Sequence, residues 1–542
     1  MQRSGLTLTI SAVIAGLAGA SLGLAPAPKG RSVLQIVPSP TSGAYTENFN
    51  PFSTSALPFT AGAIYQTLFY FNQVGPQVYP VLGTHYHWSN GNTTLTVDLR
   101  HGVKWSNGMP FTSKDVVFTF NLLKRFPALD TNAVWNHLKS VSAAGTYQVV
   151  FRFLSADVPF GWYVLGQTYI VPQAVWKKFS NPKAVTNTHP VGTGAYTLGR
   201  FSPQAYFLKA NPRYWGGKPK IATLEFPEFN SNSSASVALA SGKTGWAGLF
   251  VPNVQHIFVS KQPATNHYWY PATNLVMLFT NLKNPLLSQL PVRRAISLAI
   301  NRQELYRVGE YGYETVASPT GLVLPANRTW MNPHLPKNLQ HFQYNPQAAV
   351  KLLEHAGFHR RNGKFFTKAG KPLSLVMNVN AGASDWAEDA SIIARNLGSI
   401  GIHVTLHPLT GSYYPDLLTG HYQMAIWWGG NPTGPSPYYL YQSMLAPKSA
   451  NNFEHWHNTT TTKALQAFAA TRNPARQHAA VAKIQQVFAG QLPSIPLLNG
   501  VAWYEYNSSH VVGWPTAKNP YAVPAPWSYP ANEVILSHLR LK

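Results

Sequence analysis

The chain of 542 residues contains no cysteine. Disulfide bonds, thiolate metal sites, cysteine nucleophiles and a lipid anchor attached through cysteine are therefore all excluded. Acidic residues are also scarce, because 18 Asp and Glu stand against 42 Lys and Arg, giving a formal net charge of +24. Charged residues make up 11% of the chain, whereas a typical soluble domain has about 25%. The positive charge thus comes from missing acids and not from added bases.

This charge does not indicate a nucleic-acid-binding protein. The cationic clusters are short, such as Arg293-Arg294 and His359–Arg361, and no basic stripe or arm is present. A surface poor in carboxylates keeps nearly constant interactions in acid, since Asp and Glu are the groups that titrate between neutral pH and about pH 3. We therefore expect a protein without a nucleic-acid partner whose surface faces an acidic medium.

The N-terminal segment has the pattern of a secretory signal peptide. A positive start at Arg3 precedes a mostly apolar run from residue 6 to residue 24, with small residues at Ala18 and Ala20, as a cleavage site requires. The run is close to the roughly 20 residues that span a bilayer, so an uncleaved anchor is the alternative. We expect residues 1–20 to be removed and the mature chain to be periplasmic or extracellular.

The length predicts at least two domains, and local patterns predict an α/β fold. Apolar residues alternate from Leu95 to Leu99 as in a strand, and Thr112 with Asp115 forms a capping box that begins a helix. Two further helices are predicted, one opening at Pro291 and one from Pro346 to Gly357.

Residues 373–406 have the pattern of a βαβ unit. Residues 373–379 alternate as a strand, a helix carries Trp386 and Leu397, and a second alternating strand follows Gly401. Short connections around one helix predict a parallel pair of strands, which is typical of an α/β domain.

No catalytic or metal-binding signature is present. Ser241–Thr244 resembles the end of a phosphate-binding loop, but Val237 occupies the place of the first glycine that this loop needs. The pairs His85/His87 and His455/His457 lack third and fourth metal ligands. We therefore predict no catalytic residue, no metal site and no cofactor; a secreted hydrolase with an unrecognised site and a structural surface protein stay as alternatives.

Three tryptophans lie beside glycines, namely Trp246, Trp427 and Trp428. Most tryptophans belong to the core, yet flexible glycine neighbours can leave an indole face open for stacking on a ligand. We take these three residues as candidate ligand contacts, with Trp246 and Trp428 ahead of Trp427.

Eight stretches, in order along the chain, resemble the family 5 extracellular solute-binding proteins of the oligopeptide, dipeptide and nickel type. They are Asn48–Phe52, Leu99–Gly108, Phe111–Val117, Val191–Tyr196, Asn211–Gly217, Val292–Arg302, Leu352–Gly357 and Leu492–Leu497. The resemblance implies an α/β fold like that of the class II periplasmic binding proteins, in which two lobes close over a cleft and a smaller lobe is added. Lobe I would combine residues 31–52, 190–275 and 500–542, lobe II would be 53–189, and lobe III 276–499.

The resemblance also implies a function and a partner. Such proteins capture an oligosaccharide or oligopeptide between the lobes, deliver it to an ABC permease in the membrane, and catalyse nothing; we expect a monomer. In peptide-binding relatives an Asp three residues after a Trp pairs with the peptide amine, whereas here Asn431 follows Trp428. The segment Gly245–Pro252 is similar to the oligosaccharide-binding members, where a Trp stacks on sugar. We expect a neutral oligomer, with an oligosaccharide favoured, and a peptide-specific protein as the alternative.

Overall fold

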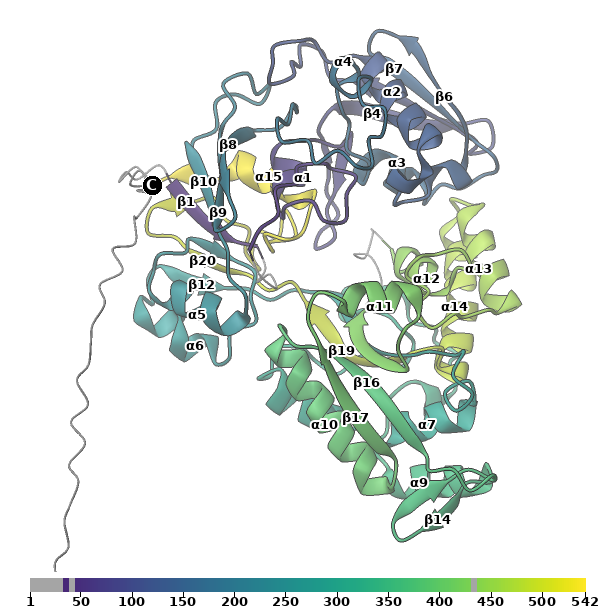
Figure 1. The fold of residues 1–542 in the computed structure, drawn as a ribbon. Coiled ribbons are helices and arrows are strands. Elements are labelled where there is room, and N and C mark those ends of the chain that lie inside the picture. The colour runs from purple at the N-terminus through teal and green to yellow at the C-terminus, as the bar shows by residue number, and fades with distance from the viewer. Residues whose placement is uncertain (1–32, 39–43, 430–435) are drawn as a thin grey trace, which may run out of the picture. The chain divides into compact units, whose positions relative to one another are not determined.

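The computed structural model describes residues 33–38, 44–429 and 436–542, which all belong to one compact unit that begins at Ser32. The predicted signal peptide, residues 1–20, lies outside the described residues. The strands of this unit form a seven-stranded, a five-stranded and a four-stranded sheet and three two-stranded ribbons (Figure 1). No helix among these residues is both long enough and apolar enough to cross a membrane.

The seven-stranded sheet draws its strands from three distant parts of the chain. Its order is β12 (Asn266–Tyr268), β20 (Glu505–Asn507), β11 (Trp246–Ala247), β1 (Val33–Val37), β10 (Thr223–Pro227), β9 (Ala205–Ala210) and β8 (Tyr196–Ser202). Strand β1 pairs in parallel with β10 on one side and with β11 on the other. Because parallel neighbours need crossover connections, the first strand is held in place by segments that come about 200 residues later along the chain. Helix α5 (Asn232–Ala240) lies between β10 and β11 in the chain, and helix α6 (Val254–Ile257) lies between β11 and β12.

The four-stranded sheet is antiparallel throughout. Its order is β4 (Gly83–Ser89), β5 (Thr94–Leu99), β7 (Gln148–Phe153) and β6 (Leu138–Gly145). Helix α2 (Ser113–Arg125) begins with the predicted capping box, in which the backbone N–H of Thr112 donates to Asp115 at 3.0 Å. The predicted strand and helix are both confirmed.

The five-stranded sheet contains the predicted βαβ unit. Its order is β17 (His403–Leu409), β16 (Ser374–Asn380), β18 (Met424–Trp428), β13 (Ala272–Thr280) and β19 (Ile495–Val501). Strands β16 and β17 pair in parallel along their whole length, and helix α10 (Ser384–Ile400) joins them. Gly401, with φ of 98°, ends this helix in the left-handed conformation that glycine adopts without strain. Helices α7 (Leu290–Ala299) and α9 (Pro346–His355) confirm the other two predictions.

The remaining elements are short or belong to the C-terminal half. The helices are α1 (Thr60–Ala63), α3 (Gly161–Gly166), α4 (Gln173–Trp176), α8 (Arg302–Glu304), α11 (Tyr413–Thr419), α12 (Tyr438–Leu445), α13 (Thr459–Ala469), α14 (Pro474–Gln491) and α15 (Ala531–His538). The ribbons pair β2 (Phe69–Phe71) with β3 (Val78–Pro80), β14 (His359–Arg361) with β15 (Lys364–Phe366), and β21 (Val511–Val512) with β22 (Arg540–Leu541). The three lobe boundaries inferred from the family resemblance stay a prediction.

Half of the acidic residues are buried. Of the 18 Asp and Glu, nine lie in the interior: Asp115, Asp157, Glu310, Glu314, Asp385, Asp389, Glu454, Glu505 and Glu533. Burial raises the pKa of most of these carboxyl groups, to about 8 for Glu454 and Glu505, because an apolar surrounding disfavours the charged form. Half of the few acids that the chain has are therefore withdrawn from its surface.

Two buried arginines are held by backbone carbonyls and not by acids. The guanidinium of Arg293 donates to the carbonyl oxygens of Leu492, Leu287, Ser288 and Gln491 at 2.7 to 2.8 Å. Arg302 donates to Pro496 and Ser297 and lies 3.5 Å from the ring centre of Phe342. Burial lowers the pKa of both groups, to about 10 and about 9. In the described part of the chain, Arg395 forms an ion pair with Glu304, and the imidazole of His137 contacts Asp157.

Candidate ligand-binding cleft

Two cavities adjoin each other through Phe71 and Trp330, which line both. The first has a volume of about 310 Å³ and the second about 340 Å³. Together they form what we call the aromatic cleft. Clefts of this size, mostly apolar with a few polar groups, are the usual form of a small-molecule site.

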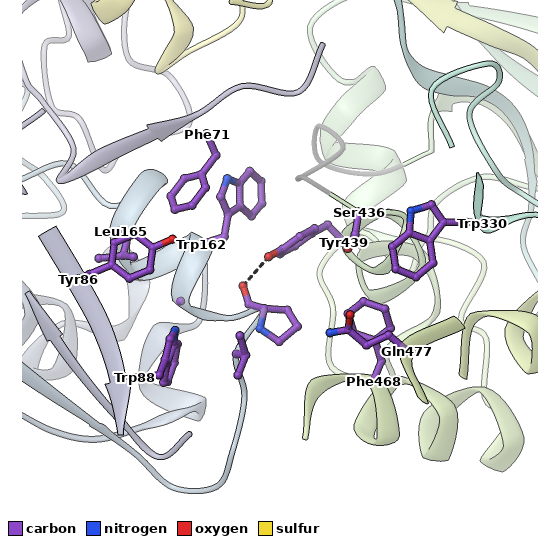
Figure 2. A pocket seen from close by; sticks show the side chains of 13 residues that line it. Phe71, Tyr86, Trp88, Trp162, Leu165, Trp330, Ser436, Tyr439, Phe468 and Gln477 are labelled. Carbon is purple, nitrogen blue, oxygen red and sulfur yellow. Dashed lines mark hydrogen bonds between the residues drawn. The ribbon is translucent and has the colours of Figure 1, made fainter. Parts of the chain in front are cut away.

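One wall of the first cavity comes from the four-stranded sheet and the chain around it. Tyr86 and Trp88 of β4 point to the same side because side chains two apart share a face of a strand. Trp162 and Leu165 of α3 complete this wall (Figure 2). Gly161 allows Trp88 to lie against the start of α3, since a Cβ at Gly161 would come within 2.7 Å of the indole.

The facing wall comes from the C-terminal half of the chain. It consists of Trp330, Ser436, Tyr439 of α12, Phe468 of α13 and Gln477 of α14 (Figure 2). Rings of the two walls meet directly, because the centroids of Trp162 and Tyr439 are 4.6 Å apart. An aromatic surface therefore runs across the cavity from one wall to the other.

Hydrogen bonds also join the two walls. The hydroxyl of Tyr439 donates to the carbonyl oxygen of Pro159 at 2.8 Å, drawn dashed in Figure 2, and the backbone N–H of Val158 donates to the carbonyl of Ala469 at 3.2 Å. We call these two bonds the latch. The structure therefore describes the cleft with its walls in contact.

A histidine–aspartate pair supports the loop that carries the latch. Nδ1 of His137 lies 2.6 Å from Oδ2 of Asp157, and the imidazole stacks on Phe160 with ring centroids 3.6 Å apart. The other oxygen of Asp157 accepts the backbone N–H of Phe160 at 3.3 Å. This pair positions Val158 and Pro159 but does not line the cavity.

Among the residues that the structure describes, those lining the two cavities carry no acidic or basic side chain. The tyrosines Tyr86 and Tyr439 stay neutral, because burial raises the pKa of both. Two basic residues lie at the edge of the wall: Arg472, which is exposed, lowers the pKa of Tyr86 against the larger effect of burial, and the ring of His478 stacks on Trp330 at 4.2 Å. The cleft thus offers rings and neutral polar groups to a ligand.

Amide groups gather in the second cavity. Its lining includes Asn72, Gln73, Gln77 and Asn327. The side-chain nitrogen of Asn72 donates to Gln77 at 2.8 Å. In contrast, Oε1 of Gln73 is buried and has no hydrogen-bond partner. Amide side chains both donate and accept hydrogen bonds, so this cavity is suited to a ligand with neutral polar groups.

Comparison with known proteins assigns the chain to a family. The sequence pattern of the bacterial extracellular solute-binding proteins, family 5 Middle, matches residues 77–452. The chain is a family 5 solute-binding protein. The predicted family and the function class that it implies, an extracellular protein that binds a solute, are both confirmed.

Relatives of this solute-binding protein are transport proteins. A putative ABC transporter peptide-binding protein of Brucella ovis is 24% identical over 473 residues, covering 83% of this chain and 84% of that protein. The peptide transport periplasmic protein SapA of Salmonella typhimurium is 24% identical over 92% of this chain and 94% of its own.

Solved structures share the fold. The mannohexaose-bound periplasmic oligopeptide-binding protein of a Thermotoga maritima ABC transporter is 26% identical, with a TM-score of 0.87 over 94% of this chain and 99% of that chain. AppA of Bacillus subtilis in complex with a nonapeptide is 19% identical, with a TM-score of 0.78 over the same shares. The predicted α/β fold of a periplasmic binding protein is therefore confirmed.

The structure places Trp246 of this solute-binding protein in the core. Its side chain is 0% exposed, its indole N–H donates to the carbonyl of Pro524 at 3.0 Å, and the rings of Phe59 and Trp514 lie 5.3 and 5.5 Å away. The expectation that this indole is exposed to a ligand is wrong.

The glycines beside Trp246 explain the error. A Cβ at Gly245 would lie 2.6 Å from Leu34, and one at Gly248 would lie 2.8 Å from the carbonyl oxygen of Pro38. These glycines therefore allow strands β1 and β11 to pack closely, and they do not open space around the indole.

The other predicted ligand contacts lie at the end of β18 or beyond it. Trp427 and Trp428 are half-buried and both pack edge-on against Trp386, at 5.3 Å. Neither lines the aromatic cleft. Asn431 lies outside the described residues, so its role, like that of the two tryptophans, stays a prediction.

The rings that line the cleft were not predicted from the sequence; they belong to Tyr86, Trp88, Trp162, Trp330 and Tyr439. One signal was present: residues 85–88 alternate histidine with an aromatic residue, and on a strand this alternation puts both rings on one face. The histidines of the other face, His85 and His87, are exposed with ring centroids 6.3 Å apart.

Proposed function

We propose that this protein captures a neutral oligosaccharide in the aromatic cleft and delivers it to the permease of an ABC importer. The observation that carries the proposal is the lining of the two adjoining cavities, whose described residues present rings and amides but no charged side chain. The C–H face of a pyranose is apolar and packs on an aromatic ring, while its hydroxyl groups form hydrogen bonds with amide side chains such as those that line the second cavity.

A peptide is the less favoured ligand. At neutral pH a free peptide brings an ammonium and a carboxylate group, and burying either without a partner of opposite charge is costly. The Thermotoga maritima relative with mannohexaose bound, 26% identical to this chain, supports the same choice. The sequence predicts the same preference, because Asn431 stands where peptide-binding relatives have the Asp that pairs with the peptide amine.

Titration calorimetry with mannohexaose and with a nonapeptide tests the ligand class. We expect heat of binding with mannohexaose and none with the nonapeptide, and the opposite pattern would return the protein to the peptide-binding group. Trp162→Ala should weaken sugar binding at least tenfold, because buried aromatic residues are the usual hot spots, whereas Trp162→Phe should keep most of the affinity.

A matched control is Tyr344→Ala, which removes a ring that is 52% exposed and does not line the cleft. It should bind like the wild type. If Trp162→Ala and Tyr344→Ala bind sugar equally well, the aromatic cleft is not the site.

We also propose where the protein works, in which medium and in which oligomeric state. The protein is exported by its signal peptide, acts as a monomer outside the cytoplasm, and works in an acidic medium. The scarcity of acids on its surface and the raised pKa of its buried carboxyl groups support the acidic medium. N-terminal sequencing of exported protein should find a start near Ser21, and light scattering should give the mass of one chain; an intact N-terminus or a dimer mass would contradict these points.

A further inference from the structure

Two short segments carry the chain from the seven-stranded to the five-stranded sheet. Residues 269–271 lead from β12 to β13, and residues 502–504 lead from β19 to β20. The segments are paired, because the backbone N–H of Trp269 donates to the carbonyl of Tyr504 at 3.1 Å and that of Ala502 to Pro271 at 2.9 Å. Bending of one sheet relative to the other must be absorbed in segments of this kind, so we call them the hinge.

A buried carboxyl group ties the two hinge segments together at one end. Glu505 is 0% exposed and begins β20. One of its oxygens accepts a hydrogen bond from the hydroxyl of Tyr270, on the other hinge segment, and the second accepts the backbone N–H of Leu249 at 3.3 Å. The carboxyl group of Glu505 therefore contacts both hinge segments and the strand region of β11.

A second buried carboxyl group holds the opposite end of the hinge. Glu314 is 0% exposed, and one of its oxygens accepts the backbone N–H of Val501, the last residue of β19, at 3.0 Å. Its neighbour Tyr313 accepts the backbone N–H of Val254 at 2.8 Å and donates to the carbonyl of Val251 at 3.3 Å. The segment 313–314 thus connects the end of the five-stranded sheet with the chain that follows β11.

Other carboxyl groups surround Glu314 on the inner side. Glu310 precedes it in the chain, and Asp385 and Asp389 face it from α10; Asp389 and Glu310 are 0% exposed. The backbone is close here, since a Cβ at Gly309 would lie 2.0 Å from Oδ1 of Asp389. Four carboxyl groups therefore share one dry space at the hinge.

The groups that face these carboxyls are acids and tyrosines. Asp385 and Asp389 act on Glu314, Glu314 acts on Glu310, and Glu388 acts on Asp389 from its own helix. Tyr270, Tyr313 and Tyr504 surround Glu505. Glu304, at the end of α8, forms an ion pair with Arg395 of α10, whose side chain is 59% exposed.

In these surroundings the carboxyl groups of Glu314 and Glu505 favour the protonated form. Burial, and for Glu314 its acidic neighbours, raises the pKa of Glu314 well above its usual range and that of Glu505 to about 8. For a carboxyl group, a raised pKa means that the arrangement around it favours the protonated form, so the arrangement loses stability as pH rises through that pKa.

We propose that protons on Glu314 and Glu505 hold the hinge in the conformation that brings the two walls of the cleft into contact, and that loss of these protons opens it. A carboxylate in this dry space is stabilised when opening of the hinge admits water. Opening of the hinge also separates the walls of the cleft and breaks the latch, so a ligand without any titratable group is retained at acid pH and released as pH rises. This inference rests on ligand capture between the walls.

The first experiment measures ligand affinity against pH. Mannohexaose is titrated calorimetrically from pH 5 to pH 9 into the wild type and into the double variant Glu314→Gln/Glu505→Gln. Glutamine has the size of a protonated glutamate and cannot lose a proton. We expect the dissociation constant of the wild type to rise at least tenfold across this range and that of the double variant to change less than threefold.

Glu454→Gln is the matched control, since it removes a titratable carboxyl group that is equally buried but is not part of the hinge. It should keep the tenfold pH dependence of the wild type. Equal pH dependence in the wild type and the double variant would overturn the proposal, and so would loss of the dependence in Glu454→Gln. Circular dichroism at each pH restricts the comparison to folded protein.

A second experiment separates this inference from the choice of ligand. Because the chain has no cysteine, dyes can be attached only at introduced sites, and Lys139→Cys with Lys463→Cys places one on each side of the cleft, both exposed. Without ligand, energy transfer should fall as pH rises in the wild type and stay constant in the double variant. This outcome is expected even if mannohexaose does not bind; constant transfer in the wild type would refute the hinge mechanism.

Discussion

Replacing Glu454 by glutamine should make the protein more stable at neutral pH and leave it unchanged in acid. Glu454 is 0% exposed, and the hydroxyl groups of Tyr422 and Ser494 are buried near it. Burial raises the pKa of Glu454 from 4.5 to about 8, against the weaker opposing effects of a backbone N–H and of the Ser494 hydroxyl. The folded protein therefore binds a proton here that the unfolded chain has already released.

The magnitude follows from linkage. Because the pKa is raised on folding, the contribution of this group to stability is complete below pH 4.5 and is lost as pH rises toward 8. Each pH unit in this window costs about 1.4 kcal/mol of unfolding free energy. The total is at most about 5 kcal/mol at pH 8, which is comparable with the entire stability of many domains.

Denaturant unfolding at pH 4, 5, 6, 7 and 8 measures the effect. The variant should match the wild type within about 1 kcal/mol at pH 4, and its advantage should grow by about 1.4 kcal/mol per pH unit above pH 4.5. Glu354→Gln, at an exposed position of α9, is the control and should show no growing advantage. Parallel pH profiles for the wild type and Glu454→Gln would refute the reasoning.

Three further predictions concern the cleft and the core. Gly161→Ala should displace Trp88, because the added Cβ lies 2.7 Å from its indole, and should weaken sugar binding several-fold by calorimetry; unchanged affinity would remove Trp88 from the site. Tyr439→Phe deletes the latch bond to Pro159 and should cost about 0.5 to 1.5 kcal/mol of binding free energy, seen as faster ligand release in stopped-flow fluorescence, whereas an unchanged release rate would contradict the latch. Trp246→Ala should lower the unfolding free energy by about 3 to 5 kcal/mol as a buried tryptophan, and a variant as stable as the wild type in denaturant would contradict its place in the core.

Elements that depend on local pattern could be predicted from the sequence. The capping box of Thr112 and Asp115 and the βαβ unit of residues 374–409 appear where alternation and helix signals place them. These patterns arise because each strand or helix buries one face, and that requirement can be read within about ten residues.

The cleft could not be predicted in the same way. Its facing rings, Trp162 and Tyr439, are 4.6 Å apart in space but belong to α3 and α12, and no local pattern links them. The glycines beside Trp246 misled for a related reason, since the atoms that crowd them belong to Leu34 and Pro38, about 200 residues earlier, and to residues 526–527 near the other end of the chain. A glycine that permits close packing and one that opens space look alike in sequence.

The carbonyl cages around Arg293 and Arg302 have a consequence for life in acid. A cation neutralised by carboxylates loses its partners when they take up protons, and acid then unfolds the protein from within. Backbone carbonyls do not take up protons in that range, so the four carbonyl oxygens around Arg293 keep their full attraction in strong acid. These two buried cations are therefore held by groups that acid does not protonate.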